Sequence, residues 1–136
     1  MLVVDANLLW EATGLGLQGA TPDAVLHRDS SWAAPRFWES GVRNICTTLM
    51  RVKKFPLSEA IKVVEDIRDL LDGEDHVPDG RRVLELAHES GQSAYDCEYV
   101  ALAESLAVRL VTFDRSLVGA FPAIAILPED FLARTG

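Results

Sequence analysis

Three aspartates stand at points where one expected element of secondary structure gives way to the next. Asp5 and Asp114 each end a short apolar run, and Asp96 lies in the first turn of a helix expected to begin after Ser93. In an open parallel sheet, residues just beyond the carboxyl ends of the strands gather at one edge with the first turns of the following helices. We therefore expect the three carboxylates to converge.

A cluster of carboxylates favours a divalent cation. Like charges a few ångströms apart raise one another's pKa unless a positive charge neutralises them. Because all the donors would be oxygen atoms, with no Cys or His among them, they favour Mg²⁺ or Mn²⁺ over Zn²⁺. Asp5, Asp96 and Asp114 are therefore candidate metal-binding residues, and a metal bound there makes them candidate catalytic residues.

Each aspartate also has a purely structural interpretation. Asp5 can cap the helix that follows it, and Asp114 can begin a turn with Arg115. Asp96 stands three residues after Ser93, which is a variant of the capping box. Spacing alone leaves these alternatives open beside the metal site.

Short apolar runs alternate with segments of helical periodicity along the chain. We expect strands at 1–5, 31–35, 109–114 and 123–127. We expect helices at about 6–13, 21–29, 37–53, 58–72, 79–90, 93–106 and after 128, with residues 72–79 as a solvated connection. Strands separated by helices predict an α/β sandwich with a parallel sheet.

Local signals predict where these helices begin and which faces they bury. The expected N-caps are Thr21, Ser58, Asp79 and Ser93, and the expected stop of the helix at 79–90 is Gly91. In helix 37–53, helical spacing predicts a core face made of Trp38, Val42, Ile45, Leu49 and Val52. The helix after Ser93 is expected to be largely buried, Tyr95 included.

Composition limits the class of protein. The 136 residues, 49% of them hydrophobic, fit one compact domain over residues 1–136. No apolar run approaches the roughly 18 residues that span a bilayer, and the acid at position 5 comes too early for a signal peptide, so we expect a cytoplasmic protein. Cys46 and Cys97 belong to no CxxC pair, which predicts buried free thiols.

The negative charge is concentrated in one block. The net charge is −8, and residues 59–104 carry four basic against thirteen acidic side chains. Overall acidity argues against a non-specific DNA coat, which depends on Lys and Arg. It does not exclude an enzyme that holds phosphate through metal ions. The basic groups that could contact a phosphate backbone, or simply be solvated helix ends, are Arg43, Arg51, Lys53, Lys54 and Arg115.

Four segments together resemble one family. They are Val3-Val-Asp5-Ala-Asn7-Leu-Leu, Ala34-Pro35 followed by Arg43-Asn44, Ser93-Ala-Tyr-Asp96-Cys-Glu-Tyr-Val-Ala-Leu-Ala103, and Leu110-Val-Thr-Phe-Asp114-Arg-Ser-Leu117. In this order, which spans nearly the whole chain, they resemble the PIN-domain ribonucleases, specifically the VapC-like toxins of bacterial toxin–antitoxin pairs.

The resemblance implies a PIN-like α/β/α sandwich with a short, mainly parallel central sheet. It also implies Mg²⁺-dependent cleavage of RNA, a homodimer, and inhibition by a partner antitoxin. On the family's motif, Asp5, Asp96 and Asp114 correspond to metal-binding acids, and Asn7 and Thr112 to polar neighbours that orient them.

The sequence departs from the family pattern at position 41. The family has a Glu three residues before the Asn that is Asn44 here, and this chain has Gly41. Helical geometry puts Glu39 about 160° around the helix from position 41, so Glu39 does not replace the missing acid. Either the family position has diverged naturally, or a Glu-to-Gly change has inactivated a toxic enzyme, which we prefer. Gly41→Glu is then expected to raise nuclease activity and toxicity.

Functions of other classes are also open. A PIN-like module lacking the fourth acid could bind RNA or an antitoxin and hydrolyse little. A receiver-like domain would need a Lys after a late strand, and a haloacid-dehalogenase-type phosphatase would need Asp-x-Asp where this chain has Asp5-Ala-Asn7. The apolar face that includes Ile61, Val64, Ile67 and Leu71 is either core or an antitoxin contact.

Overall fold

The sheet of the computed structural model is built from five short strands that all run parallel. The structure describes residues 1–16 and 19–134. The strands are β1 (Leu2–Val4), β2 (Trp32–Pro35), β3 (Asp75–His76), β4 (Leu110–Val111) and β5 (Ala125–Ile126). Their order in the sheet is β3-β2-β1-β4-β5. The predicted α/β sandwich with a parallel sheet is confirmed.

The strand order creates one switch point. From β1 the chain moves outward through β2 to β3, then returns to the other side of β1 and moves outward again through β4 to β5. In open parallel sheets, ligands bind outside the carboxyl ends of the two strands at which the order reverses. Those strands here are β1 and β4. Asp5 follows β1 directly, and Asp114 lies three residues beyond the end of β4.

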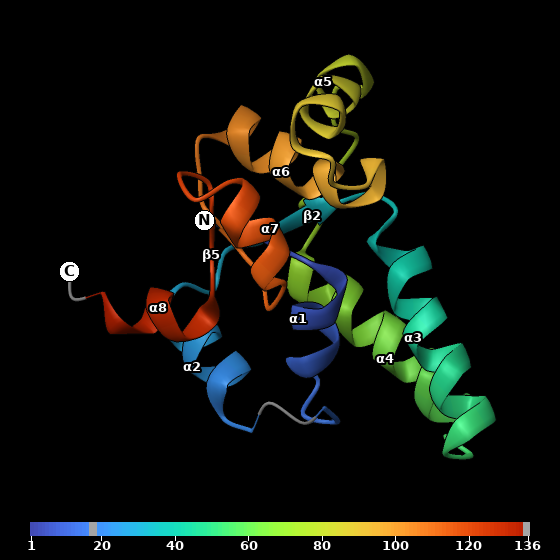
Figure 1. The fold of residues 1–136 in the computed structure, drawn as a ribbon. Helices are drawn as coiled ribbons and strands as arrows, with labels where there is room; N and C mark the ends of the chain where they lie inside the picture. Colours follow the sequence, from blue (N-terminus) through green and yellow to red (C-terminus); the bar gives the residue numbers. More distant parts are fainter. Residues whose placement is uncertain (17–18, 135–136) are drawn as a thin grey trace.

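Eight helices surround the sheet within the described residues (Figure 1). They are α1 (Ala6–Glu11), α2 (Thr21–Arg28), α3 (Trp38–Val52), α4 (Leu57–Leu71), α5 (Gly80–Ser90), α6 (Ala94–Leu106), α7 (Arg115–Ala120) and α8 (Pro128–Ala133). Helix α6 packs on β1, β2 and β4, α4 packs on β2, and α3 packs against α1 and α4. In this part of the chain, no helix is both long and apolar enough to cross a bilayer.

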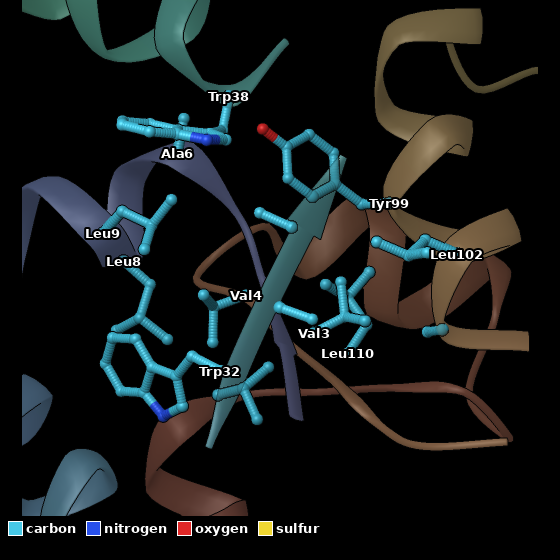
Figure 2. Close-up of a cluster of buried hydrophobic side chains, with 14 of the residues drawn as sticks. Val3, Val4, Ala6, Leu8, Leu9, Trp32, Trp38, Tyr99, Leu102 and Leu110 are labelled. Carbon is cyan, nitrogen blue, oxygen red and sulfur yellow. The ribbon is translucent and has the colours of Figure 1, made fainter. Parts of the chain in front are cut away.

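The core lies on both faces of β1 and β2. Figure 2 shows Leu8 and Leu9 of α1 on one side of these strands, and Tyr99 and Leu102 of α6 on the other. All four side chains are buried, as are the strand residues between them. At about 1.5–3 kcal/mol for each large apolar side chain removed from water, this double-sided burial accounts for the near-continuous apolar runs of the strands. Cys46 and Cys97 are buried free thiols, as predicted.

Two of the four predicted side-chain caps form, and two are wrong. Asp79 accepts a hydrogen bond from the Arg81 amide at 3.1 Å, and Ser93 accepts one from the Asp96 amide at 3.0 Å. Gly91 ends α5 with a φ of +75°, which favours glycine. Thr21 and Ser58 instead lie inside α2 and α4, whose N-cap residues make no side-chain cap bond. In α2 the helix begins at Thr21 itself, with Pro22 in its first turn, and in α4 Pro56, two residues before Ser58, is the N-cap residue.

The connection predicted at 72–79 contains an edge strand. β3 pairs with β2 in parallel, with Asp75 opposite Ala34 and His76 opposite Pro35. A two-residue polar strand has no apolar alternation to reveal it, because its side chains are only half buried at the sheet edge.

Two residues predicted to be buried are exposed. Val52, at the end of α3, is 72% exposed, because the last turn of α3 and the start of α4 project beyond the sheet (Figure 1). Cys46 takes an inner position on this helix instead. Tyr95, in the first turn of α6, is 40% exposed. Helical spacing identifies a face but not the point along the helix at which the core ends.

Candidate active site

The Asp5 carboxylate joins β1 to both α1 and β4. As the N-cap of α1, its Oδ1 accepts a hydrogen bond from the Leu8 amide at 2.9 Å. Its Oδ2 accepts a hydrogen bond from the Thr112 hydroxyl. The capping interpretation of Asp5 is therefore correct, and the side chain is fixed at the switch point of the sheet by two donors.

Thr112 connects two of the aspartates. Its side chain is fully buried, and while its hydroxyl donates to Asp5, its Oγ1 accepts a hydrogen bond from the Asp114 amide at 3.0 Å. Asp114 Oδ1 in turn accepts from the Leu117 amide at 3.1 Å and caps α7. Asp114 therefore begins a helix rather than the turn with Arg115 that its sequence also allowed. A buried hydroxyl that acts as both donor and acceptor holds the two carboxylates in a fixed relation.

Asp96 is presented differently. Ser93 caps α6 through the Asp96 amide, but the Asp96 carboxylate makes no hydrogen bond to any residue that the structure describes, so the reciprocal half of a capping box is absent. The Asp96 oxygens are therefore not committed to the backbone. A half-buried carboxylate without a protein donor is available to a cation or to water.

One cavity of about 500 Å³ is lined by all three aspartates. We call it the acid cavity. Further lining residues come from α1, α3 and α6 and include Asn7, Ser40, Gly41, Asn44, Ile45, Tyr95 and Tyr99. Within the described residues, no three Asp, Glu, His or Cys side chains are close enough to hold one ion together. The acids thus share a cavity without forming a closed coordination sphere.

The three carboxylates of the acid cavity lie close enough for their negative charges to repel one another. Burial, with smaller contributions from the charges of Asp114 and Asp96, raises the pKa of Asp5 from 3.8 to about 6 despite the lowering effect of the hydrogen bonds from Thr112 and Leu8. Asp5 therefore carries an ionisation penalty that a nearby cation would remove. All the acidic donors are oxygen atoms, which suits Mg²⁺ or Mn²⁺.

Tyr95 occupies the space above Gly41. A Cβ atom on residue 41 would lie 2.2 Å from Tyr95 Oη and 2.9 Å from Ala6 Cβ. Both separations are below any normal carbon contact, so a larger residue at position 41 requires the Tyr95 side chain to move and the contact with Ala6 of α1 to widen. Burial raises the pKa of Tyr95, so its hydroxyl contributes a neutral donor to the cavity wall rather than a charge. Position 41 does face the cavity beside Asn44, as helical geometry predicts.

Glu39 lies away from the acid cavity, also as helical geometry predicts. Its carboxylate pairs with Arg43 at 2.9 Å and with Arg68 of α4 at 2.8 Å. It therefore links α3 to α4 and does not supply the acid that position 41 lacks.

The basic residues considered for RNA contact lie outside the acid cavity. Arg43 pairs with Glu39, and Arg115 pairs with Glu129 at 3.0 Å. The others, Arg51, Lys53 and Lys54, are exposed near the projecting end of α3. Among the sequence candidates, the cavity brings together Asp5, Asn7, Asp96 and Asp114, with Thr112 behind them.

Sequence reasoning missed the contribution of Tyr95 to the cavity wall. Tyr95 and Tyr99 are four residues apart, one turn of α6, with ring centres separated by 6.0 Å. Their spacing indicated one buried face, whereas the structure buries Tyr99 and leaves Tyr95 partly exposed. One feature of the sequence could have identified Tyr95: it stands next to the candidate ligand Asp96 in the first turn of α6, at the end of the helix that faces the sheet edge.

A groove between α3 and α4 forms a second notable surface. It has a volume of about 410 Å³ and is lined in part by Met50, Leu57, Ile61 and Val64. Ile61 is 52% exposed, whereas Ile67 and Leu71 of the same helix are buried. The apolar face predicted for α4 is therefore divided: one part is core, and the other borders this groove.

Solved structures similar to this chain include the following two. One is the crystal structure of PAE2754 from Pyrobaculum aerophilum, with 23% identity over 98% of this chain and 87% of that chain, and a TM-score of 0.74. The other is the crystal structure of FitAcB from Neisseria gonorrhoeae, with 16% identity over 95% of this chain and 99% of that chain, and a TM-score of 0.71. No family model and no curated protein matches the sequence. At these identities the similarity establishes the fold, and the predicted PIN-like α/β/α sandwich is confirmed.

Proposed function

We propose that this protein is a metal-dependent ribonuclease of the toxin–antitoxin type. The observation that carries the proposal is the acid cavity at the β1/β4 switch point, where Asp5, Asp96 and Asp114 face a common space. The PIN-like fold and the four motif segments of the sequence support the same reading.

The metal that suits this cavity is Mg²⁺ or Mn²⁺, held by Asp5, Asp96 and Asp114. When bound, such an ion supplies a Lewis acid that stabilises the negative charge of a phosphodiester during hydrolysis. Because the three carboxylates are not close enough to enclose an ion as they stand, binding requires their side chains to move or water to complete the coordination. Mg²⁺ commonly keeps several waters and takes one or two carboxylates.

The residues of the chain have distinct roles in this proposal. Thr112 and the Leu8 amide hold Asp5 in place, and the Leu117 amide holds Asp114. Asp96, whose carboxylate accepts no hydrogen bond from the part of the chain that the structure describes, is the acid best able to adjust to a cation. The exposed amides of Asn7 and Asn44 line the same cavity and can donate hydrogen bonds to phosphate oxygens.

The test compares RNA cleavage by wild type and Asp96→Asn in Mg²⁺ and in EDTA. The amide leaves the Ser93 cap intact, because that bond uses the backbone of residue 96. Cleavage is expected to need the metal and to fall by roughly 10- to 100-fold or more in the variant. The matched control is Asp23→Asn, which changes an exposed acid in the first turn of α2, away from the cavity. Equal loss in both variants, or metal-independent cleavage, would overturn the proposal.

A second candidate function is binding without appreciable hydrolysis. It is favoured by Gly41, which leaves the cavity without the fourth acid and with Tyr95 in its space. RNA binding by wild type in EDTA, without cleavage in Mg²⁺ or Mn²⁺, would identify this function.

We further propose an antitoxin protein as the partner and a homodimer as the assembly. The α3–α4 groove supports a protein partner, because Leu57 and Ile61 are exposed beside it. Sedimentation equilibrium of the isolated chain measures the assembly, and a monomer at micromolar concentration would contradict the homodimer.

A further inference from the structure

A second cavity adjoins the acid cavity at an aromatic pair. It has a volume of about 350 Å³ and is lined in part by Phe37 and Ser40. Ser40 also lines the acid cavity. Phe37 packs edge to face on Tyr95 of the acid cavity, with ring centres 4.6 Å apart and planes at 81°. This space, which we call the Phe37 cavity, therefore lies next to the three aspartates.

Arg36 gives the Phe37 cavity an available positive charge. Its side chain is 68% exposed, and its ion pair with Asp75 is long, with 3.8 Å between Nε and Oδ2. Exposed ion pairs of this kind contribute little, so the guanidinium can turn to another anion without a large loss. Its planar set of donors matches the oxygens of a phosphate group.

Arg43 is a second arginine on the wall of the Phe37 cavity. Its partner Glu39 is shared with Arg68. Two guanidinium groups thus share the Glu39 carboxylate. The wall of the Phe37 cavity holds two arginines, Arg36 and Arg43, and two glutamates, Glu39 and Glu98, so its charges are mixed, and Arg36 is the arginine of this wall without a short ion pair.

The remaining walls suit a nucleobase. Phe37, Val77 and Pro78 present apolar surface, and Glu98 presents a carboxylate. Unstacked bases of single-stranded RNA are recognised by stacking on aromatic rings and by hydrogen bonds to their edges. A carboxylate accepts a hydrogen bond from an exocyclic amino group and repels a phosphate, so the base belongs near Glu98 and the phosphate near Arg36.

We propose that the Phe37 cavity binds the nucleotide next to the one whose phosphate enters the acid cavity, with the base against Phe37 and its phosphate on Arg36. This inference rests on the proposed function, because it takes single-stranded RNA as the substrate. The volume of the cavity lies within the range of about 300–1,000 Å³ typical of small-molecule sites. An acidic peptide would satisfy Arg36 but would leave Glu98 facing like charge, so RNA is the ligand that the walls favour.

The test measures binding of a fluorescein-labelled single-stranded RNA decamer of mixed sequence, by anisotropy in EDTA so that no metal-dependent cleavage takes place. Phe37→Leu keeps apolar volume but removes the flat ring, and we expect it to weaken binding by about 5- to 150-fold, the range for stacking of one base. Arg36→Gln is expected to weaken binding and to reduce the slope of log affinity against log salt by about 0.7, the value for one phosphate contact on a single strand.

A matched control and a second probe keep the outcomes distinct. Arg81→Gln removes another exposed arginine with a long ion pair, 4.0 Å to Glu85, from α5, and is expected to leave RNA binding unchanged. Circular dichroism checks folding, and Arg36→Gln tests the proposal even where Phe37→Leu unfolds. A glutamate decapeptide that binds as tightly as the RNA, with dependence on Arg36 alone, would overturn the proposal in favour of a protein ligand.

The results separate this inference from the proposed function. RNA that binds wild type and both Phe37 cavity variants equally would overturn the subsite and leave the nuclease proposal standing. RNA binding that depends on Phe37 and Arg36, without cleavage in Mg²⁺, would support the subsite and overturn the nuclease. Absence of RNA binding by wild type would overturn both.

Discussion

A single methyl group added at position 41 tests how closely Tyr95 packs on α3. In the wild type the new Cβ would lie 2.2 Å from Tyr95 Oη and 2.9 Å from Ala6 Cβ. In a Tyr95→Phe background the hydroxyl is gone, and the nearest ring atom, Cζ, is 3.6 Å away, an ordinary van der Waals contact. Gly41→Ala should therefore be less favourable in the wild type than in Tyr95→Phe.

The magnitude follows from two opposing terms. Overpacking at a tight site costs about 1–3 kcal/mol, whereas alanine gains about 1 kcal/mol over glycine inside a helix. Gly41→Ala is thus expected to lower the free energy of unfolding of the wild type by up to about 2 kcal/mol. In Tyr95→Phe only the contact with Ala6 remains, so we expect a coupling energy of about 1–2 kcal/mol between the two positions.

The assay is urea unfolding of the four proteins of this double-mutant cycle, followed by circular dichroism at pH 7 in EDTA. Gly119→Ala is the matched control. Gly119 lies inside α7, and no heavy atom lies within 4 Å of its added Cβ, so this variant should gain about 0.5–1 kcal/mol. Effects at Gly41 and Tyr95 that add within about 0.3–0.5 kcal/mol would refute the close packing of the Tyr95 hydroxyl on α3.

Three further predictions concern the acid cavity. Because the pKa of Asp5 is raised from 3.8 to about 6 in the folded protein, ionisation of Asp5 lowers the stability of the fold as the pH rises through that window. Between pH 4 and pH 7, the free energy of unfolding of Asp5→Asn, measured with urea in EDTA, should therefore rise by roughly 1–3 kcal/mol relative to that of wild type. An identical pH dependence in the two proteins would contradict this. Mg²⁺ at ten times its dissociation constant should stabilise wild type by about 1.4 kcal/mol, a rise in Tm of a few degrees that Asp96→Asn should lose; an equal rise in Asp96→Asn would argue against that ligand. Gly41→Glu alone should lower stability through its overlap with Tyr95, and should raise RNA cleavage only when combined with Tyr95→Ala; a gain of cleavage with Tyr95 intact would mean that the ring moves aside freely.

The positions of Asp5 and Asp114 could be predicted because local and global signals agree there. Each is a helix N-cap, and each follows a strand that the apolar pattern identifies. A parallel sheet then places both at the same edge. The order of the strands, which makes β1 and β4 neighbours, depends on long-range pairing, and no local pattern in the sequence encodes it.

The environment of Gly41 illustrates what sequence reasoning could not supply. Spacing correctly predicted that position 41 lies beside Asn44 and that Glu39 points away. The sequence therefore favoured the interpretation that glycine at this position removes a catalytic acid, because local helix propensity gives no reason for a glycine there. The structure supplies one in the close approach of Tyr95 and Ala6, contacts that join three helices and depend on how they pack.

The most direct test of the central claim is a crystal structure of the protein soaked in Mn²⁺, with anomalous differences measured at a wavelength at which manganese scatters anomalously. The account predicts a peak in the acid cavity, about 2.0–2.6 Å from carboxylate oxygens of Asp5, Asp96 or Asp114, with the remaining acids reached directly or through one water. An empty acid cavity at saturating Mn²⁺, or an arrangement with one of the three carboxylates more than about 10 Å from the others, would contradict the claim that these aspartates form a cation site.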